Sequence, residues 1–144
     1  MKILVDADAC PVKNILEATA KQFGLQVKMF SDTSHQLHSS YSDIVVVDQG
    51  ADSVDLVLIN TAQKGDIIVT QDFGLAALAL GKGCYAIRPD GLIFDSENID
   101  FLLMERCASA NIRRSGGKCK HIKKRSKVQD DLFKKNLVAL CKGL

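Results

Sequence analysis

The chain has 144 residues, of which 47% are hydrophobic and 25% are charged, and its formal net charge is +2. A chain of this length suits one compact domain over residues 1–144, large enough to bury a core without disulfide bonds. The sequence contains no apolar stretch of about 18 residues and no signal-peptide pattern, so we expect a cytoplasmic protein without membrane contact.

The first predicted element is an apolar strand over residues 2–5, which ends at Asp6. An uninterrupted apolar run is typical of a parallel strand that is covered on both faces. A helix is predicted over residues 11–23, with Pro11 in its first turn, where the missing N–H is not needed. Residues 25–29 alternate between apolar and polar side chains, which predicts a half-exposed edge strand. Together these elements predict a right-handed β-α-β unit.

Two further buried strands are predicted, and each leads into a helix. Residues 44–47 form one strand, which ends at Asp48, and apolar residues at helical spacing predict a helix over residues 51–63. Residues 65–70 form the other strand, and Asp72 begins a short helix that is apolar all round and must be buried. Strands that alternate with helices indicate an α/β fold, here a three-layer α-β-α sandwich with a mostly parallel sheet.

The last third of the chain is less regular. A strand is predicted over residues 84–88, followed by a turn at residues 89–91 and a helix over residues 97–112 that Ser96 caps. An amphipathic helix over residues 129–141 ends the chain. Its predicted inward-facing residues are Leu132, Phe133, Leu137 and Leu140.

Six aspartates fall at strand ends or in the first turn of a helix: Asp6, Asp8, Asp48, Asp52, Asp55 and Asp72. Parallel strands deliver their carboxyl ends to one rim of the sheet, where ligands bind, so we expect a cluster there with Asp8 at its edge. Carboxylate oxygens suit Mg²⁺ or Mn²⁺. An acidic residue in a first helical turn can instead stabilise the helix dipole by about 0.3–1 kcal/mol, but that role does not explain six on one rim. The predicted metal ligands are Asp6, Asp52, Asp55 and Asp72.

Two other side chains lie near the predicted rim. His35 follows the second strand in a run of small polar residues, and it is either a general acid or phosphate donor or simply a solvated histidine. Cys10 stands at a helix start, where thiolates are stabilised, but the neighbouring aspartates disfavour a second negative charge. We therefore interpret Cys10 as a packing residue. The five cysteines include no C-x-x-C pair, which argues against a zinc site.

The positive charge is concentrated in residues 113–127. Without the eight bases of this segment, which contains no acid, the 19 Lys and Arg fall to 11 against 17 Asp and Glu. A basic arm on an acidic body suits an enzyme that binds a metal and gathers phosphates, whereas the alternative is a solvated, disordered charge run. We expect a flexible segment that binds nucleic acid, with RNA as the first candidate. Its basic residues are Arg113, Arg114, Lys118, Lys120, Lys123, Lys124, Arg125 and Lys127.

Four stretches of the chain closely resemble the bacterial YaiI/YqxD family: residues 5–12, 47–52, 70–76 and 113–117. The resemblance runs nearly end to end and implies a PIN-like fold. PIN-like nuclease domains carry an Asp at the end of the first strand, acids in a central helix and a Thr-x-Asp after a later strand. The matching positions are Asp6, Asp52 or Asp55, and Asp72 after Thr70. Gln71 and the extension over residues 8–11 depart from the general PIN pattern.

The first functional hypothesis is a Mg²⁺- or Mn²⁺-dependent nuclease that hydrolyses phosphodiesters in RNA or another nucleic acid. The Asp6-x-Asp8 pair after an apolar strand also suits a phosphatase of the haloacid-dehalogenase type, in which the first aspartate is phosphorylated. That class needs a lysine near the phosphate, and no rim loop offers an obvious one. A third hypothesis is a non-catalytic RNA-binding module that uses the basic segment.

Overall fold

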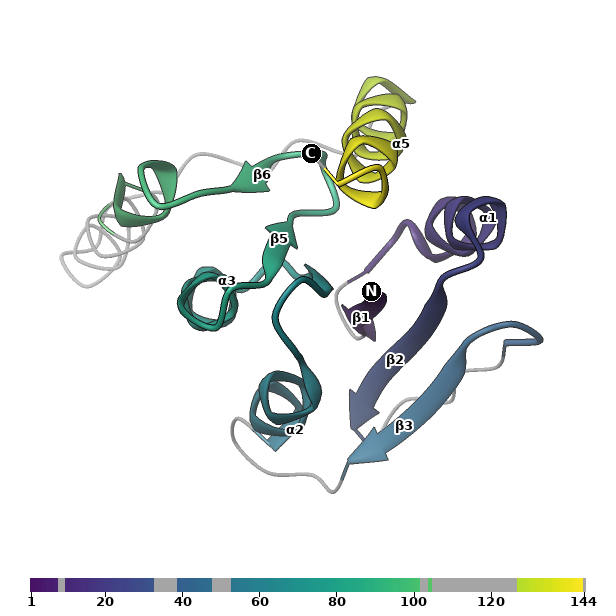
Figure 1. Ribbon diagram of the computed structural model, residues 1–144, viewed down its shortest axis with the longest axis horizontal. Coiled ribbons are helices and arrows are strands. Elements are labelled where there is room, and N and C mark those ends of the chain that lie inside the picture. Colours follow the sequence, from purple (N-terminus) through teal and green to yellow (C-terminus); the bar gives the residue numbers. More distant parts are fainter. Residues whose placement is uncertain (8–9, 33–38, 48–52, 102–103, 105–126, 144) are drawn as a thin grey trace, which may run out of the picture.

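A six-stranded sheet with the strand order β3-β2-β1-β4-β5-β6 forms the centre of the molecule (Figure 1). The computed structural model describes residues 1–7, 10–32, 39–47, 53–101, 104 and 127–143. All neighbouring strands run parallel except β5 and β6, which pair antiparallel. The strands are β1 (Lys2–Asp6), β2 (Gln26–Asp32), β3 (Asp43–Val47), β4 (Ile67–Val69), β5 (Tyr85–Ile87) and β6 (Ile93–Phe94).

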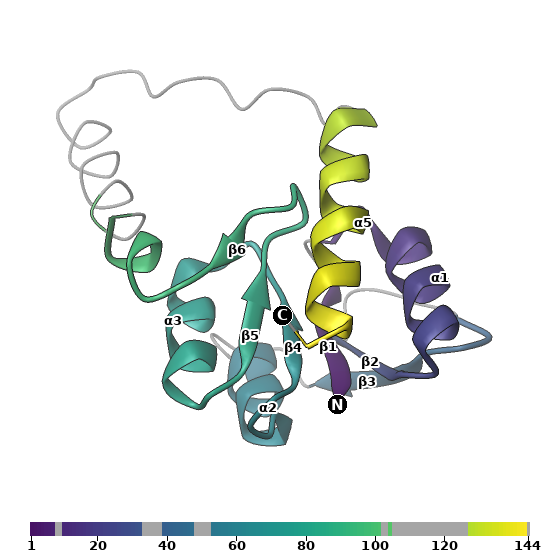
Figure 2. The ribbon, with the colours of Figure 1, turned by 45° about the horizontal axis from the view of Figure 1, so that its top comes forward.

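Helices cover both faces of the sheet, which makes the three-layer α-β-α sandwich predicted from the sequence (Figures 1 and 2). The helices α1 (Lys13–Phe23) and α5 (Lys127–Cys141) contact each other on one face. The helices α2 (Ser53–Thr61) and α3 (Phe73–Gly81) lie together on the other. Among the described residues, no helix is long and apolar enough to cross a membrane.

The alternation of side chains along the strands builds one hydrophobic core on each face of the sheet. In β1, Ile3 and Val5 belong to the core under α1 and α5, whereas Leu4 belongs to the core under α2 and α3. The same alternation holds in β4, where Ile68 faces α2 and α3. Because successive side chains of a strand point to opposite faces, Asp6, two residues after Leu4, lies on the same face of the sheet as Leu4.

The two strands on one side of the sheet exchange the roles predicted for them. We expected β2 at the edge, but it lies between β1 and β3, and the apolar strand β3 forms the edge. The side chain of Val46 in β3 is 58% exposed. The prediction failed because burial of a strand depends on its neighbours in space, which an apolar run does not identify.

The elements of the last third also differ from the sequence prediction in detail. The short strand β6 was not predicted. Residues 98–101 are helical, in agreement with the start of the helix predicted over residues 97–112, and residues 105–112 lie outside the described residues. The cap of that turn is Asp95 rather than Ser96, because the Asp95 carboxylate accepts hydrogen bonds from the backbone of Glu97 and Asn98. In α5, Phe133, Leu137 and Leu140 are buried as predicted, but Leu132 is 43% exposed.

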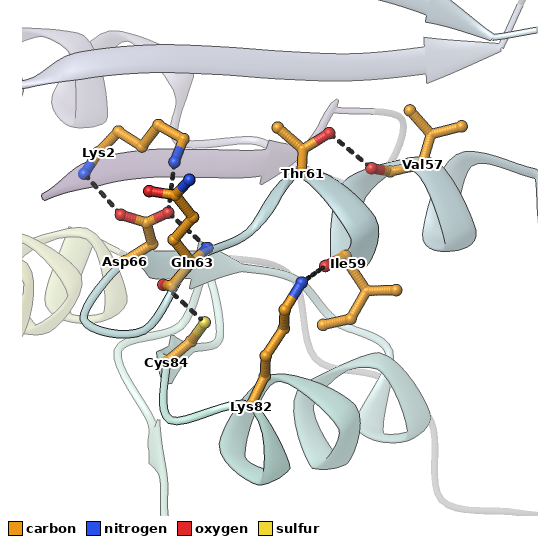
Figure 3. A network of polar contacts seen from close by, with 8 residues as sticks. All are labelled: Lys2, Val57, Ile59, Thr61, Gln63, Asp66, Lys82 and Cys84. Atoms are coloured by element: carbon orange, nitrogen blue, oxygen red, sulfur yellow. Dashed lines mark hydrogen bonds and ion pairs between the residues drawn. The ribbon is translucent and has the colours of Figure 1, made fainter.

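A buried carboxylate, Asp66, holds the amino-terminal ends of β1 and β4 together (Figure 3). Its side chain is in contact with Lys2 Nζ at 2.6 Å, and it accepts hydrogen bonds from the backbone N–H groups of Lys2 and Gln63 at 3.1 and 2.9 Å. Burial alone would raise the pKa of Asp66, but these partners lower it below its ordinary value. This network is structural, and it lies at the opposite ends of β1 and β4 from the predicted acidic cluster.

Candidate functional site

The carboxyl ends of β1 and β4 form the point where the order of the strands reverses. The chain passes from β1 outward to β2 and β3, then crosses to β4 on the other side of β1. Helices leave adjacent strands in opposite directions at such a point, and the crevice between them is the usual ligand site of an open α/β sheet. Asp6 ends β1, and Thr70 directly follows β4.

Asp6 and Thr70 face each other across this point. The register pairs Val5 with Val69, so the residues that follow them are also neighbours. The Thr70 hydroxyl donates to Asp6 Oδ2 over 3.4 Å, which is a long hydrogen bond. Thr70 is only 1% exposed, and its backbone N–H donates to the carbonyl of Ile87. The hydroxyl is therefore fixed by the strand and shielded from bulk water.

Asp72 is hydrogen-bonded to the same hydroxyl and caps the helix α3. Its backbone N–H donates to Thr70 Oγ1 at 3.0 Å, and its Oδ1 accepts from the N–H groups of Gly74 and Leu75 at 2.8 and 3.2 Å. A side-chain oxygen that accepts such bonds is a typical N-cap. Thr70 thus connects the carboxylate of Asp6 to the backbone of Asp72.

Asp55 comes to the same region from α2, where it lies in the first turn. A groove runs between α2 and α3, and both Asp55 and Asp72 line it. Its other lining residues are apolar: Leu56, Ile59, Gly74, Leu75 and Leu78. The structure therefore brings together Asp55 with Asp72, and Asp6 with Thr70 and Asp72, on the face of the sheet that α2 and α3 cover.

These carboxylates offer hard oxygen donors but not a complete metal cage. Among the described residues, no group of three or more His, Cys, Asp or Glu side chains is arranged to hold a metal ion. Mg²⁺ usually keeps several waters and binds proteins through one or two carboxylates, so the donor chemistry fits this ion. The predicted convergence of four aspartates stays a prediction, since Asp52 lies outside the described residues.

Several other predicted site residues also lie outside the described residues: Asp8, His35, Asp48 and the bases from Arg113 to Arg125. Lys127 is described and is the first residue of α5, so the end of the basic segment is helical and exposed. Cys10 is 7% exposed and belongs to the core under α1 and α5. This burial agrees with the interpretation of Cys10 as a packing residue.

Arg88 follows β5 at the same rim and was not among the predicted site residues. Its Nε and Nη2 donate to the two carboxylate oxygens of Asp90 at 2.9 and 2.6 Å. Its guanidinium carbon lies 5.9 Å from the centre of the Phe73 ring. Arg88 is identified by its place after β5, which is adjacent to β4. To see this, the order of the strands in the sheet must be known, and their positions in the chain do not give it.

The chain is similar to known proteins along almost its whole length. The family described as "Uncharacterized BCR, YaiI/YqxD family" matches residues 4–143. A UPF0178 protein of Ruminiclostridium cellulolyticum is 52% identical over 142 residues, which cover 99% of this chain and 93% of the relative. A UPF0178 protein of Clostridium tetani is 52% identical over 140 residues, which cover 97% and 96%. No solved structure matches the chain. The protein belongs to the YaiI/YqxD family.

Proposed function

We propose that this protein is a Mg²⁺- or Mn²⁺-dependent nuclease that hydrolyses phosphodiester bonds, with RNA as its first candidate substrate. The observation that carries the proposal is the connection of Asp6 and Asp72 through the buried hydroxyl of Thr70. This arrangement lies at the carboxyl ends of two central parallel strands, where open α/β sheets bind their ligands. The PIN-like architecture and the Thr70-x-Asp72 pattern support the same reaction class.

The residues that would hold the ion are Asp6 and Asp72, with Asp55 across the groove between α2 and α3. A bound divalent ion activates water and neutralises charge on the phosphodiester. Thr70 orients the carboxylate of Asp6, because the Thr70 hydroxyl is itself fixed by the N–H of Asp72. The cap on α3 likewise fixes the Asp72 carboxylate.

Substrate capture follows from the distribution of charge. Residues 113–127 contribute eight bases to a chain whose remainder is acidic. We assign this segment to the phosphates of the nucleic acid, since lysine and arginine contacts to phosphates supply affinity that does not depend on sequence.

The direct test is cleavage of single-stranded RNA by the purified protein at a series of Mn²⁺ concentrations. We expect Mn²⁺-dependent cleavage that falls at least about 100-fold in Asp6→Asn, since removal of a metal-binding charge costs several kcal/mol of barrier. Asp43→Asn is the matched control, because Asp43 is an exposed carboxylate at the amino-terminal end of β3. Equal rates for Asp6→Asn and the parent protein would refute the proposal.

The second candidate function is a non-catalytic RNA-binding module. It is favoured by the eight bases of residues 113–127, which suit phosphate binding that needs no metal ion. This module would bind RNA equally well with Mn²⁺ and with a chelator present, and it would release no cleavage products. A metal-dependent nuclease would produce fragments that disappear when the chelator is added.

A further inference from the structure

The strand register extends the candidate site to a third strand. Val5 pairs with Val69, and Val69 pairs with Ile87, so these residues form one row across β1, β4 and β5. The hydrogen bond from Thr70 N to the carbonyl of Ile87 continues this pairing beyond the end of β4. The next row across the rim consists of Asp6, Thr70 and Arg88.

All three side chains of this row belong to the face that α2 and α3 cover. The hydrogen bond between Thr70 and Asp6 brings two of them together. The third, Arg88, lies over the ring of Phe73, which packs against the core under α2 and α3. Adjacent strands are about 4.8 Å apart, so the backbones of Asp6 and Arg88 are separated by roughly 10 Å across Thr70.

The guanidinium of Arg88 is held in a fixed orientation. Asp90 accepts from its Nε and Nη2 in a two-point contact, and the ring of Phe73 lies 5.9 Å from its central carbon. Phe73 is in turn held edge-on against Phe94, with 5.9 Å between the ring centres. Such a two-point contact with a planar partner restricts rotation of an arginine side chain.

The turn that carries Asp90 is also anchored. Leu92 N donates to Asp90 Oδ1, and Asn136 of α5 donates to the carbonyl of Gly91 at 2.6 Å. Gly91 has a φ of 102°, and a Cβ there would lie 2.7 Å from a side-chain carbon of Leu132. The turn is therefore fitted closely against α5, and it holds Arg88 as part of a rigid unit.

One edge of the guanidinium is left for a ligand. The contacts with Asp90 use Nε and Nη2, and within the described parts of the chain Nη1 has no acceptor. The Arg88 side chain is 28% exposed, so it is accessible but partly removed from water. A partly desolvated guanidinium attracts an anion more strongly than one in bulk water does, because the effective dielectric constant is lower.

We propose that Arg88 binds the non-bridging oxygens of the phosphodiester that the site cleaves. This inference rests on the proposed nuclease function and deepens it by naming the protein cation for the substrate phosphate. Asp6 alone would repel a phosphate, whereas the open edge of the Arg88 guanidinium offers charge-assisted N–H donors to its oxygens, and Asp90 balances the formal charge of the arginine on the other edge. The span from Asp6 through Thr70 to Arg88 gives a carboxylate for the ion at one end and a guanidinium for the anion at the other.

A purely structural role for Arg88 predicts a different behaviour. In that case the contact with Asp90 would only fasten the turn between β5 and β6. Loss of Arg88 would then lower thermal stability and affect charged and uncharged ligands alike. A phosphate-binding role instead links Arg88 to the charge of the phosphate itself, so the charge of the ligand is the variable to test.

The experiment measures binding of two dinucleotide analogues of UpU by NMR titration in Ca²⁺, which takes the same oxygen ligands as Mg²⁺ and replaces the ion proposed for cleavage. One has its single natural phosphodiester, and the other has an uncharged methylphosphonate in its place. We expect the parent protein to prefer the charged ligand at least about 10-fold and Arg88→Gln to prefer it less than about 2-fold, since charge-assisted contacts to phosphate are the stronger kind. Lys82→Gln is the matched control, because Lys82 is an exposed base that follows α3 and donates to the carbonyl of Ile59 (Figure 3). It should retain the full preference.

Cleavage of single-stranded RNA in Mn²⁺ separates this inference from the function on which it rests. We expect Arg88→Gln to cleave at least about 100-fold more slowly, and Arg88→Lys to recover only part of the loss because lysine lacks the two-point geometry. If the parent protein cleaves RNA and Arg88→Gln keeps the parent's preference for the charged ligand, the proposed role of Arg88 is refuted and the nuclease function stands. A preference that depends on Arg88 without any cleavage would overturn the nuclease and leave Arg88 as a phosphate-binding residue. The absence of any preference in the parent would overturn the inference as well.

Discussion

Asp72 has two roles that two substitutions can separate. It caps α3 through Oδ1, and it is a proposed metal ligand. Asp72→Asn keeps an acceptor for the cap and removes the charge, which costs about 0.5 kcal/mol at a helix N-terminus. Asp72→Ala also loses the cap, which adds about 1 kcal/mol, for a total of about 1.5 kcal/mol. For a domain of this size, each kcal/mol of lost stability lowers Tm by roughly 3–4 °C. We therefore expect Tm to fall by about 2 °C in Asp72→Asn and by about 5 °C in Asp72→Ala.

Cleavage should not follow this order of stability. Both variants lose the carboxylate, so both should lose Mn²⁺-dependent cleavage of RNA to the same extent, at least about 100-fold. Thermal unfolding monitored by circular dichroism, beside the cleavage rate at a temperature well below both transitions, makes the comparison. Activity in Asp72→Asn close to that of the parent would show that only the cap matters and would refute the catalytic reasoning.

Three further predictions concern other parts of the molecule. Asp66→Asn should lower the free energy of unfolding by about 1–3 kcal/mol at neutral pH, since a buried, hydrogen-bonded charge is lost. Because the pKa of Asp66 in the folded protein is lowered from 3.8, its stabilisation is present above that pH and is lost as the pH falls through the folded value. Urea unfolding at pH 7 and at about pH 3 should therefore show that the difference in the free energy of unfolding between the parent and Asp66→Asn is smaller at the lower pH. A difference that does not depend on pH would contradict the role of the charge. Cys10→Ser should keep cleavage within a few-fold, and complete loss with an unchanged circular dichroism spectrum would indicate cysteine chemistry instead. A variant with four bases replaced by serine should bind single strands with a slope of log affinity against log salt concentration that is less steep by up to about 3. The four bases are Lys120, Lys123, Lys124 and Arg125. Equal slopes in the parent and the variant would identify the segment as a solvated charge run.

The strands and helices that position the site could be predicted because their signals are local. The apolar runs that end at Asp6 and before Thr70 form β1 and β4, and Asp72 begins α3 as expected. Gly24 ends α1 in the left-handed conformation, with a φ of 65°, which glycine adopts at little cost. Each of these features depends on residues that are close together in the chain.

The features that were missed depend on contacts between distant residues. The strand β3 reads as buried, yet it lies at the edge because no further strand pairs with it in the described sheet. Arg88 is predicted only as the last residue of a strand, and the register of three strands is needed to place it beside Thr70. The sequence pattern marks Thr70 only as the residue two positions before Asp72, and its link to both Asp6 and Asp72 is evident only from the geometry.

The proposed metal site is tested most directly by a crystal structure of the protein soaked with Mn²⁺ and recorded at a wavelength where manganese scatters anomalously. We expect an anomalous peak at the carboxyl ends of β1 and β4, in direct contact with a carboxylate oxygen of Asp6 or Asp72, and no such peak in crystals of Asp6→Asn. The absence of manganese from this rim in the parent protein, or its presence at another site alone, would contradict a metal-dependent nuclease.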